Sequence, residues 1–571
     1  MSQRASFVQR AANYFGMSGR AELFAAASLF LLLVAFKAVN ILYQGFDSDE
    51  AQHLHVIWAW TRGLVQYRDV FDNHMPLFQI LFAPIFALVG ERATALFWMR
   101  FLLLPMYFVA AWCTYRIGEL LFSRRAGAWA VLLAGFYVHY HFRSLEFRTD
   151  NLWAPLWLLC LTTLFSGPFT IRRALVAGLL LGLCFGVSLK STVFLLVLLM
   201  SAPCAVFLLG HKPLSFSRKD AALSAAAFLM SMLIVPCAIM IFFALNGVWS
   251  EFSYSVFEHN LLSNVDEAHH RVGNVILSLV AFPFVVYAAR LIARFTDDAV
   301  LSLRRGFAVL VVGFYQPVLY SFWTLITRQD FLPFYPLAFV FVSGALFTIA
   351  AWFEKSGGLI GQFLRPAWLA AIIAAFEFVF SLSTRPFWIN GAKVEIDLVR
   401  DVLALTAPND HVFDCKSETL FRPRCTRLIL EKITRERIAR GLMTDDIPQR
   451  CVETRTCVAT ISAHISEKAG AFVQKNYLPV TELLRVAGVR LTSTSSEQTI
   501  NFEVVIPASY QIIAPNAAVA GFLDGTPYDG TRFLNAGAHT FAQTSNAHEL
   551  VLLWSRAVDR HYIPFGKVSL H

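Results

Sequence analysis

Two short acidic segments lie between long apolar stretches near the start of the chain. The first comprises residues 47–50 (DSDE) and the second residues 146–150 (EFRTD). Carboxylates next to a bilayer are costly and are retained mainly where a polar site needs them. We therefore expect the chemistry of this protein at these side chains, with a solvated loop at a helix end as the alternative for either segment.

Basic side chains fall on the same predicted face of the membrane. Lys190 interrupts a long apolar stretch, Arg328 stands in a short loop, and His74 follows an acidic residue and an asparagine. Taken singly, Lys190 could extend to the interface and His74 could cap the next helix. Ions of both signs at one membrane face indicate a polar cavity, so together the clusters favour a functional site.

The composition indicates a membrane protein. Of 571 residues, 57% are hydrophobic and 15% are charged, whereas about a quarter of a soluble domain is charged. The net charge of +9 indicates membrane topology rather than nucleic-acid binding, because Lys and Arg concentrate in short loops. No small-residue cleavage site follows the first apolar segment, which is predicted to remain as an uncleaved anchor.

The predicted architecture is a polytopic α-helical membrane protein with about 11 transmembrane helices, since a span needs about 20 apolar residues. With the N-terminus in the cytoplasm, the basic loops at 123–125, 171–173, 211–219 and 294–305 fall inside. Both acidic segments, and everything after about residue 387, then fall outside. The predicted spans lie near residues 22–43, 98–120, 126–143, 152–168, 174–189, 191–210, 220–246, 274–293, 306–326, 331–352 and 366–386.

The first outer loop is predicted to run from about residue 44 to 97. Within it, residues 75–90 are apolar but short and contain two prolines. We expect them to form a re-entrant or interfacial helix rather than a span. Ala51, Leu54 and Trp58 recur at helical spacing and predict another helix that lies in the membrane interface with its polar side toward the site.

The chain changes character near residue 388, where charge rises and long apolar runs end. Residues 388–499 mix helical and strand patterns and predict an extracytoplasmic α/β domain. Residues 500–571 alternate apolar runs with Asp-Gly pairs, the strongest short-range hairpin signal. They predict a small β-sandwich that resembles the PEGA-type modules of cell-envelope proteins. The domain that precedes both, residues 1–387, is the predicted transmembrane catalytic domain.

Four of the nine cysteines lie in the outer region. In an oxidising compartment they could form two disulfides with three possible connectivities. The spacing is not that of a CxxC zinc pattern, and no histidine pair accompanies it, so structural cysteines are favoured over metal ligands. The four are Cys415, Cys425, Cys451 and Cys457.

From about residue 20 to residue 385 the chain resembles the GT-C membrane glycosyltransferases, which include protein O-mannosyltransferases and the aminoarabinose transferase of lipid A. Each motif is short, but five occur in the family's order on one topology. They are 46–51 (FDSDEA) for the "DE" loop, 72–77 (DNHMPL) for "D-x-(H/K)-P-P-L" with Met75 in place of the first proline, 146–150 for the second acidic motif, 178–192 for "G-x-x-x-G…(T)-K", and 328–336 (RQDFLPFYP) for "R-x-x-Y-L-x-P-x-x-P" with Phe331 in place of tyrosine.

The resemblance implies an inverting glycosyltransferase that moves a sugar from a polyprenyl-phosphate donor to a lipid, glycan or protein acceptor of the cell envelope. An attacking hydroxyl loses its proton as the new bond forms, so a positioned carboxylate serves as general base. Asp49 matches the catalytic aspartate of the family, and Glu50 would orient it or the acceptor. Asp47 is close enough to act instead. Glu146 and Asp150 match the second acidic motif.

The leaving group is a lipid phosphate, whose growing negative charge needs fixed cations. His74, Lys190 and Arg328 are the candidates, and Arg328 is best suited to bidentate phosphate binding. No cofactor is assigned. A divalent cation is left open, because four carboxylates could supply oxygen ligands: Asp47, Asp49, Glu50 and Asp150.

The main alternative is a secondary transporter or flippase for a lipid-linked or anionic substrate, since intramembrane charges suit that class too. Against it, no internal repeat relates the two halves, and the charges gather at one membrane face. A non-catalytic scaffold would leave the acidic motifs unexplained. The expected location is the cell inner membrane, with the C-terminal region in the periplasm. The sugar, the acceptor and the oligomeric state are left open.

Overall fold

The computed structural model describes residues 7–209, 218–261, 268–323, 325–355, 365–491, 499–515, 517–545 and 549–565. Most of the basic loop predicted at 211–219 lies outside these ranges. The chain forms two compact units. Unit 1 comprises Met1–Gln44, Asn73–Phe82 and Phe97–Asn390, and unit 2 comprises Gly45–Asp72, Ala83–Leu96 and Gly391–His571.

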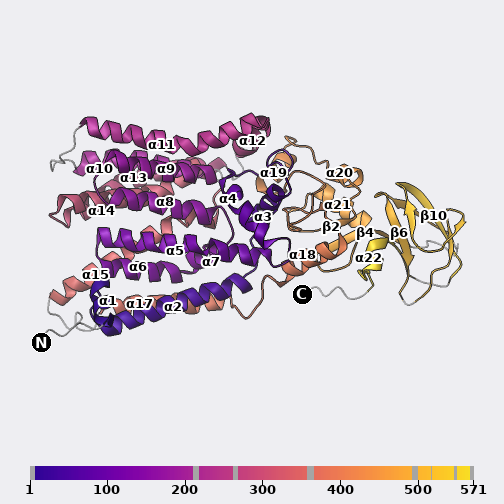
Figure 1. The fold of residues 1–571 in the computed structure, drawn as a ribbon, viewed down its shortest axis with the longest axis horizontal. Coiled ribbons are helices and arrows are strands. Elements are labelled where there is room, and N and C mark those ends of the chain that lie inside the picture. Colours follow the sequence, from indigo (N-terminus) through magenta and orange to yellow (C-terminus); the bar gives the residue numbers. More distant parts are fainter. Residues whose placement is uncertain are drawn as a thin grey trace. The chain divides into compact units, whose positions relative to one another are not determined.

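Unit 1 is helical, and its long helices run side by side (Figure 1). Helix α9 packs against α8 and α11, α13 and α10 pack against α14, and α15 and α17 pack against α6. The π-helix η1 spans Tyr254–Glu258, and the 3-10 helix η2 spans Arg328–Phe331. The α-helices are α1 Phe7–Phe15, α2 Arg20–Tyr43, α5 Ala95–Leu121, α6 Arg124–Phe136, α7 Val138–Arg143, α8 Asp150–Phe165, α9 Ile171–Val187, α10 Ser191–Leu209, α11 Arg218–Leu245, α12 Trp249–Ser253, α13 Ala268–Arg294, α14 Ala299–Phe322, α15 Phe334–Lys355 and α17 Pro366–Thr384.

Each of the eleven predicted spans coincides with helix, and the predicted 126–143 span is divided into α6 and α7. Six of the described helices are long and apolar enough to cross a membrane, namely α2, α5, α11, α14, α15 and α17. Helices α8 and α9 have only 16 and 17 residues, fewer than the roughly 20 that a straight span needs. The count of about 11 crossings therefore stays a prediction.

Two glycines of the 178–192 motif allow close helix packing. A Cβ atom at Gly178 would lie 2.2 Å from the Phe228 carbonyl oxygen, and one at Gly182 would lie 2.5 Å from the Met232 carbonyl oxygen. Both carbonyls belong to α11, so any larger side chain would force α9 and α11 apart. This packing gives the spacing of the two glycines a structural reason.

The outer-loop helix α3, Ser48–Thr61, was predicted to lie in the membrane interface, and this prediction is wrong. Every residue from Glu50 to Ala59 is buried in protein, so the helix has no face left for lipid. The second outer-loop helix, α4, spans Leu77–Val89 and has 13 residues. It is too short to cross the bilayer, and its predicted re-entrant position stays a prediction.

Unit 2 contains two sheets within the described residues. The first has seven strands in the order β1-β2-β4-β11-β6-β9, with β3 also paired to β4, and the second has the order β5-β10-β7-β8. Strand β4 pairs with β11, so the first sheet joins the regions predicted as separate domains at 388–499 and 500–571. The strands are β1 Val412–Phe413, β2 Val458–Thr460, β3 Tyr477–Pro479, β4 Leu484–Leu491, β5 Thr499–Val504, β6 Ala508–Ile513, β7 Gly521–Leu523, β8 Thr526–Pro527, β9 Arg532–Leu534, β10 Gly537–Gln543 and β11 Leu550–Trp554.

Apolar residues from both sheets and from the helices of unit 2 form one core, which includes Val402, Phe541 and Leu552. The predicted Asp-Gly hairpin is confirmed between β7 and β8. Asp524 and Gly525 have φ values of 51° and 76°, as a two-residue turn that follows the twist of its strands requires. The helices of this unit, besides α3, are α18 Lys393–Leu405, α19 Lys432–Ala439, α20 Ile447–Glu453, α21 Glu467–Asn476 and α22 Ser555–Asp559.

Candidate functional site

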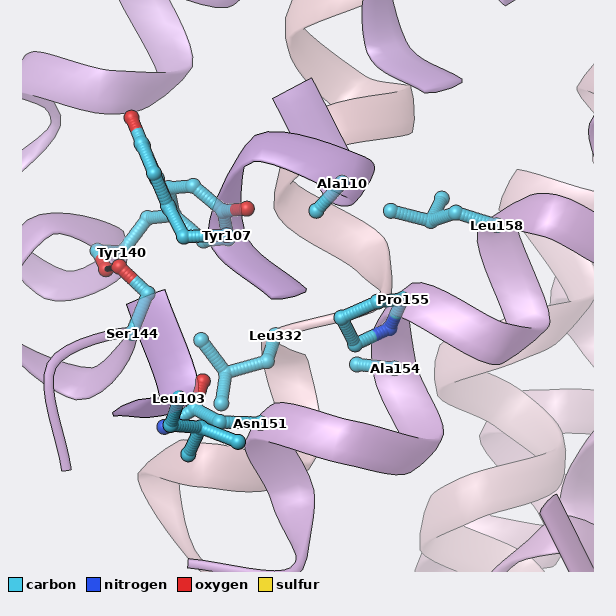
Figure 2. A pocket seen from close by; sticks show the side chains of 10 residues that line it. All are labelled: Leu103, Tyr107, Ala110, Tyr140, Ser144, Asn151, Ala154, Pro155, Leu158 and Leu332. Atoms are coloured by element: carbon cyan, nitrogen blue, oxygen red, sulfur yellow. Dashed lines mark hydrogen bonds between the residues drawn. The ribbon is translucent and has the colours of Figure 1, made fainter. Parts of the chain in front are cut away.

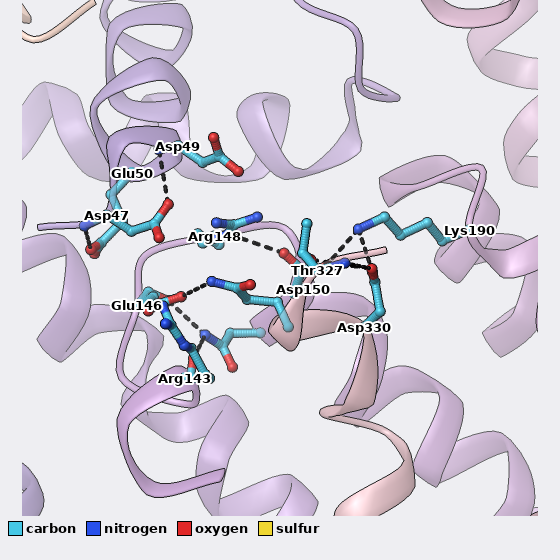
Figure 3. Close-up of polar contacts among 12 residues, drawn as sticks. Asp47, Asp49, Glu50, Arg143, Glu146, Arg148, Asp150, Lys190, Thr327 and Asp330 are labelled. Atoms are coloured by element: carbon cyan, nitrogen blue, oxygen red, sulfur yellow. Dashed lines mark hydrogen bonds and ion pairs between the residues drawn. The ribbon is translucent and has the colours of Figure 1, made fainter. Parts of the chain in front are cut away.

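The first acidic segment begins helix α3, and two of its carboxylates cap that helix. Asp47 is the N-cap, and its Oδ1 accepts a hydrogen bond from the Asp49 amide at 3.1 Å. Glu50 reaches back, and its Oε1 accepts from the Asp47 amide at 2.8 Å (Figure 3). This reciprocal arrangement satisfies amide groups that the first turn of a helix leaves without partners. Asp47 and Glu50 thus have a structural task in unit 2.

Asp49 has a different environment. Its carboxylate forms an ion pair with the ammonium of Lys416, which also donates to the Ser48 hydroxyl at 2.9 Å. The Asp49 side chain is 20% exposed and that of Lys416 is 10% exposed. His464 and Arg435 lie near enough to this pair to share its electrostatic field. Asp49 is therefore the residue of the acidic segment that faces a cationic neighbourhood.

Lys416 belongs to the loop of residues 414–420, which two carboxylates organise. Glu418 accepts from the Lys416 amide at 2.7 Å, and Asp414 makes several further contacts. The Asp414 side chain accepts from the Ser417 amide at 2.8 Å, the Thr419 amide at 3.1 Å and the Arg424 Nε at 2.6 Å. Burial alone would raise the pKa of Asp414, but the Arg424 charge and the Thr419 hydrogen bonds outweigh it and lower this pKa below the usual value. Asp414 is thus ionised and holds the loop closed.

The 414–420 loop is also tied to α3 through His55. The buried His55 ring lies with Nδ1 2.6 Å from the Leu420 carbonyl oxygen, and the ring stacks on Trp58 with centroids 5.2 Å apart. Burial lowers the pKa of His55 to about 4. At neutral pH the ring is therefore uncharged, and Nδ1 carries the proton that it donates to Leu420.

The second acidic motif is part of a buried ion network in unit 1 (Figure 3). Lys190, just before α10, forms an ion pair with Asp330, and its ammonium lies 3.6 Å from Asp150 at the start of α8. Asp330 also accepts from the Thr327 amide at 2.6 Å, which caps η2. Arg148 contacts the other Asp150 oxygen at 3.2 Å. Lys190 thus joins three chain segments.

Glu146 extends the same network. Arg143 contacts one of its carboxylate oxygens at 2.5 Å, and the Gln329 amide donates to the other at 2.8 Å. The predicted residues Glu146, Asp150 and Lys190 are therefore brought together. Buried charges need such partners, because an unpaired ion in the interior is strongly destabilising. The network balances three carboxylates against three cations: Glu146, Asp150 and Asp330 face Arg143, Arg148 and Lys190.

Arg328 lies at the edge of this network and is exposed, although its neighbours Gln329 and Asp330 are buried. Its charge, with those of Arg143 and Arg385, acts on the exposed imidazole of His139. Arg328 and Arg385 are thus exposed cations of this part of unit 1, whereas Arg143 is already paired with Glu146.

His74 is half-buried in the segment 73–82, which belongs to unit 1. Its neighbour Asn73 is held by Asn260, whose side-chain amide donates to the Asn73 carbonyl oxygen at 2.9 Å. Asn260 follows helix η1, so the segment that carries His74 is anchored to the loop between α11 and α13. The prediction that His74 contacts a donor phosphate is not tested by these contacts.

Comparison with known proteins gives the fold. No protein-family model and no curated protein sequence matches the chain. The apo structure of ArnT from Cupriavidus metallidurans is similar to it with a TM-score of 0.55 and 12% identity, over 81% of this chain and 98% of ArnT. The chain therefore shares the fold of this ArnT structure, which is the GT-C fold.

Two further solved structures match with lower scores. ArnT from the same organism bound to undecaprenyl phosphate has a TM-score of 0.48 and 10% identity, over 80% of this chain and 97% of that one. The apo oligosaccharyltransferase of Archaeoglobus fulgidus has a TM-score of 0.48 and 10% identity, over 90% of this chain and 74% of that one. The GT-C fold predicted from the five motifs is thus confirmed by the apo ArnT structure.

Figure 2 shows a small pocket of unit 1, and every residue that lines it is uncharged. Lys37 lies beside it and donates to the Ser144 hydroxyl at 2.8 Å, with its ammonium 4.0 Å from the centroid of the Tyr107 ring. None of the predicted site residues lines this pocket, so it gives no support to the predicted chemistry. Its lining residues are Leu103, Tyr107, Ala110, Tyr140, Ser144, Asn151, Ala154, Pro155, Leu158 and Leu332.

The contacts of the acidic segment bear on the open question of a divalent cation. Asp47 and Glu50 each use an oxygen in capping, and Asp49 uses one in the pair with Lys416. Each of these carboxylates has a second oxygen that the three contacts leave unassigned, so the divalent cation stays an open question.

The sequence analysis missed two residues that contact the predicted site residues, Lys416 and Asp330. Lys416 lies 367 positions from Asp49, and no local pattern marks it. Asp330, the partner of Lys190, stands inside the 328–336 motif, where its charge was a usable signal. The capping role of Asp47 and Glu50 could also have been predicted from the sequence. An N-cap residue followed three residues later by Glu has the spacing of a capping box.

Proposed function

We propose that this chain is an inverting membrane glycosyltransferase that uses a polyprenyl-phosphate sugar as donor. The GT-C fold and the six apolar helices support the class. The main support for the proposal is that the three acidic residues of the 47–50 segment make different contacts. Two of its acids cap α3, and the third, Asp49, lies partly exposed beside Lys416.

Asp49 acts as general base in the proposed reaction. The acceptor oxygen or nitrogen attacks the anomeric carbon of the donor sugar, and the bond from that carbon to the phosphate oxygen breaks. The proton of the acceptor passes to a carboxylate oxygen of Asp49, and polyprenyl phosphate leaves with the bonding electrons. A carboxylate that is held ionised can accept this proton as the transition state forms.

Arg328 binds the donor phosphate in this proposal. Its guanidinium is exposed and shares its neighbourhood with Arg143, Arg385 and His139, and an arginine can bind a phosphate through two parallel hydrogen bonds. Lys190, also a predicted phosphate ligand, already faces two carboxylates. We therefore assign Lys190 to holding the site together, and His74 stays a candidate for the phosphate.

The proposed setting is the outer face of the cell inner membrane, with unit 2 in the periplasm. The isoprenoid tail of the donor then remains in lipid, and only the head group enters the site. The proposed acceptor is a lipid, glycan or protein of the cell envelope. Glu146 and Asp150, which lie in the buried network of unit 1, position the surrounding loops.

Purified protein in liposomes, given a panel of radiolabelled polyprenyl-phosphate sugars and an envelope extract as acceptor, tests the proposal. We expect label to move from at least one donor to an acceptor, with release of polyprenyl phosphate. Movement of the intact labelled donor across the bilayer without any transfer would instead support the flippase alternative and contradict the glycosyltransferase proposal.

A further inference from the structure

We propose that Lys416 is a positioning residue for Asp49, supplied by the C-terminal part of unit 2. This inference rests on the proposed function, in which Asp49 is the general base. It adds a residue that no motif in the first 387 positions contains, and it gives the C-terminal region a part in the reaction.

The contact between the two side chains is specific. The Lys416 ammonium pairs with Asp49 Oδ1 and donates to the Ser48 hydroxyl at 2.9 Å. Two adjacent residues in the first turn of α3 thus share one cation. Lys416 is 8% exposed, so its ammonium is held among protein groups rather than in solvent. An ion pair between two side chains with this little exposure holds the carboxylate in one position.

The loop that carries Lys416 is rigidly built. Asp414 binds two loop amides and Arg424, and Arg424 donates in turn to the Leu428 carbonyl oxygen at 2.8 Å. Ser417 and Leu420 have φ values of 67° and 60°, a conformation that residues other than glycine rarely adopt and that persists only where surrounding contacts impose it.

The 414–420 loop contacts α3 at two points about two helical turns apart. Lys416 contacts the start of the helix at Ser48 and Asp49, and the Leu420 carbonyl accepts from His55 at 2.6 Å. A lysine side chain is long and flexible, so two anchors on a stiff loop are what fix the position of its ammonium relative to Asp49. Neutralising the charge of Asp49 would not need a loop with two anchors, whereas holding its carboxylate in one place would.

The test compares Lys416→Met, Lys416→Gln and Lys416→Arg with the wild-type protein in the transfer assay. We expect kcat of the two neutral variants to fall about 100-fold, as displacement of a reacting group by about 1 Å can cause. The KM for the donor should remain within about twofold of the wild-type value, because Lys416 does not touch the donor. Lys416→Arg, which keeps the charge, should restore most of the turnover.

A matched control is Lys475→Met. Lys475 is also a lysine of unit 2 paired with an acid, Glu503, but its side chain is 70% exposed, so its removal should leave kcat and KM unchanged. A folded neutral variant of Lys416 with wild-type kcat, or one that loses only donor affinity, would overturn the proposal.

The Lys416→Arg variant distinguishes a loss of folding from a loss of turnover. If the neutral variants do not fold, Lys416→Arg decides: wild-type turnover supports the proposal, and a folded but inactive Arg variant contradicts it. If the wild-type protein transfers no sugar from any donor, the proposed function is wrong. If the wild-type protein is active but its turnover does not change when Lys416 is replaced, only the proposal about Lys416 is wrong.

Discussion

At the scale of single residues, neighbouring carboxylates of the same chemical type do different work in this protein. Asp47 and Glu50 bind backbone amides at the start of α3, whereas Asp49 pairs with a lysine side chain. The difference follows from helix geometry, because the side chains of the N-cap and of the third helical residue can reach the free amides, whereas Asp49 is the second helical residue and pairs with Lys416.

Replacing Asp47 by alanine should therefore affect stability more than chemistry. We expect the free energy of unfolding to fall by about 1 kcal/mol, the usual cost of losing an N-cap side chain, while turnover remains near that of the wild type. Chemical denaturation followed by tryptophan fluorescence measures the first quantity. Asp529→Ala is the control, since the Asp529 side chain is 84% exposed. Loss of turnover without loss of stability would make Asp47 the base.

His55 should make the stability of unit 2 depend on pH. Its pKa is about 4 in the folded protein because of burial and about 6.5 in an unfolded chain. The unfolded state therefore binds the proton more tightly, so the contribution is complete above pH 6.5 and is lost as the pH falls toward 4. The loss should reach about 3 kcal/mol.

Thermal unfolding measured from pH 7 to pH 4 tests this prediction. The variant His55→Gln keeps a donor for the Leu420 carbonyl oxygen but has no titrating group. Its unfolding temperature should change less over this range than that of the wild type. Equal slopes for the two proteins would show that His55 is not buried as a neutral ring.

The sequence allowed the acidic residues to be found but not the partner of the most important one. The 47–50 segment is conspicuous because charge is rare in its surroundings. Lys416 is one of many basic residues in a polar region, and only folding brings it to Asp49 across 367 positions. Local pattern carries no information about such a contact.

At the scale of secondary-structure elements, the ion network of unit 1 joins the ends of α8, α10 and η2. Lys190→Met should lower the free energy of unfolding by about 3–5 kcal/mol, because it leaves Asp150 and Asp330 buried without their shared cation.

Arg328→Ala should leave the free energy of unfolding unchanged, since Arg328 is exposed, and should raise the KM for the donor. Unfolding curves and donor kinetics of both variants check this contrast, and an unstable Arg328→Ala protein would contradict it.

Two cysteines on separate elements are placed to react with each other. The sulfur atoms of Cys425 and Cys451, the latter in α20, lie 3.3 Å apart. In an oxidising compartment, with a thiol–disulfide oxidoreductase as electron acceptor, we expect these two thiols to form a disulfide. Closing a loop of this length should stabilise unit 2 by about 3–4 kcal/mol.

Peptide mass spectrometry without reduction identifies the pairing, and the Cys451→Ser variant measures its contribution. A linked Cys425–Cys451 peptide is expected. A disulfide between Cys415 and Cys425, or four free thiols in protein isolated from an oxidising compartment, would contradict this connectivity. The sequence left three connectivities open, because cysteine spacing alone does not determine which sulfurs meet.

Helices and strands could be predicted from the sequence where the pattern that defines them lies within a short stretch of chain. Residues 388–499 were expected to mix helices and strands, and helix α18 is one of these helices, with its apolar spacing complete within 13 residues. The helix at 48–61 was also expected, but its interfacial position was wrong. Its burial depends on distant chain segments such as residues 414–420, which periodicity cannot reveal.

At the scale of the whole molecule, composition and contacts divide the chain differently. Composition separates an apolar N-terminal part from a polar part that begins near residue 388. The contacts place Gly45–Asp72 and Ala83–Leu96 in the same compact unit as residues 391–571. The proposed catalytic Asp49 therefore belongs to the unit of the C-terminal region, although the family motif that contains it lies near the N-terminus.

The prediction that Asp49 and Asp150 share one pocket stays a prediction, because these residues belong to different units. Domain-level boundaries at 387 and 499 were drawn from composition, and they stay predictions too.

The most direct test of the central claim is the turnover of Asp49→Asn measured beside its donor affinity. Amide replacement keeps the size of the side chain and removes its ability to accept the acceptor's proton. We expect kcat to fall by about 10²–10⁴-fold, with the donor dissociation constant and the unfolding temperature close to those of the wild type. An Asp49→Asn protein that transfers sugar at the wild-type rate would contradict the account.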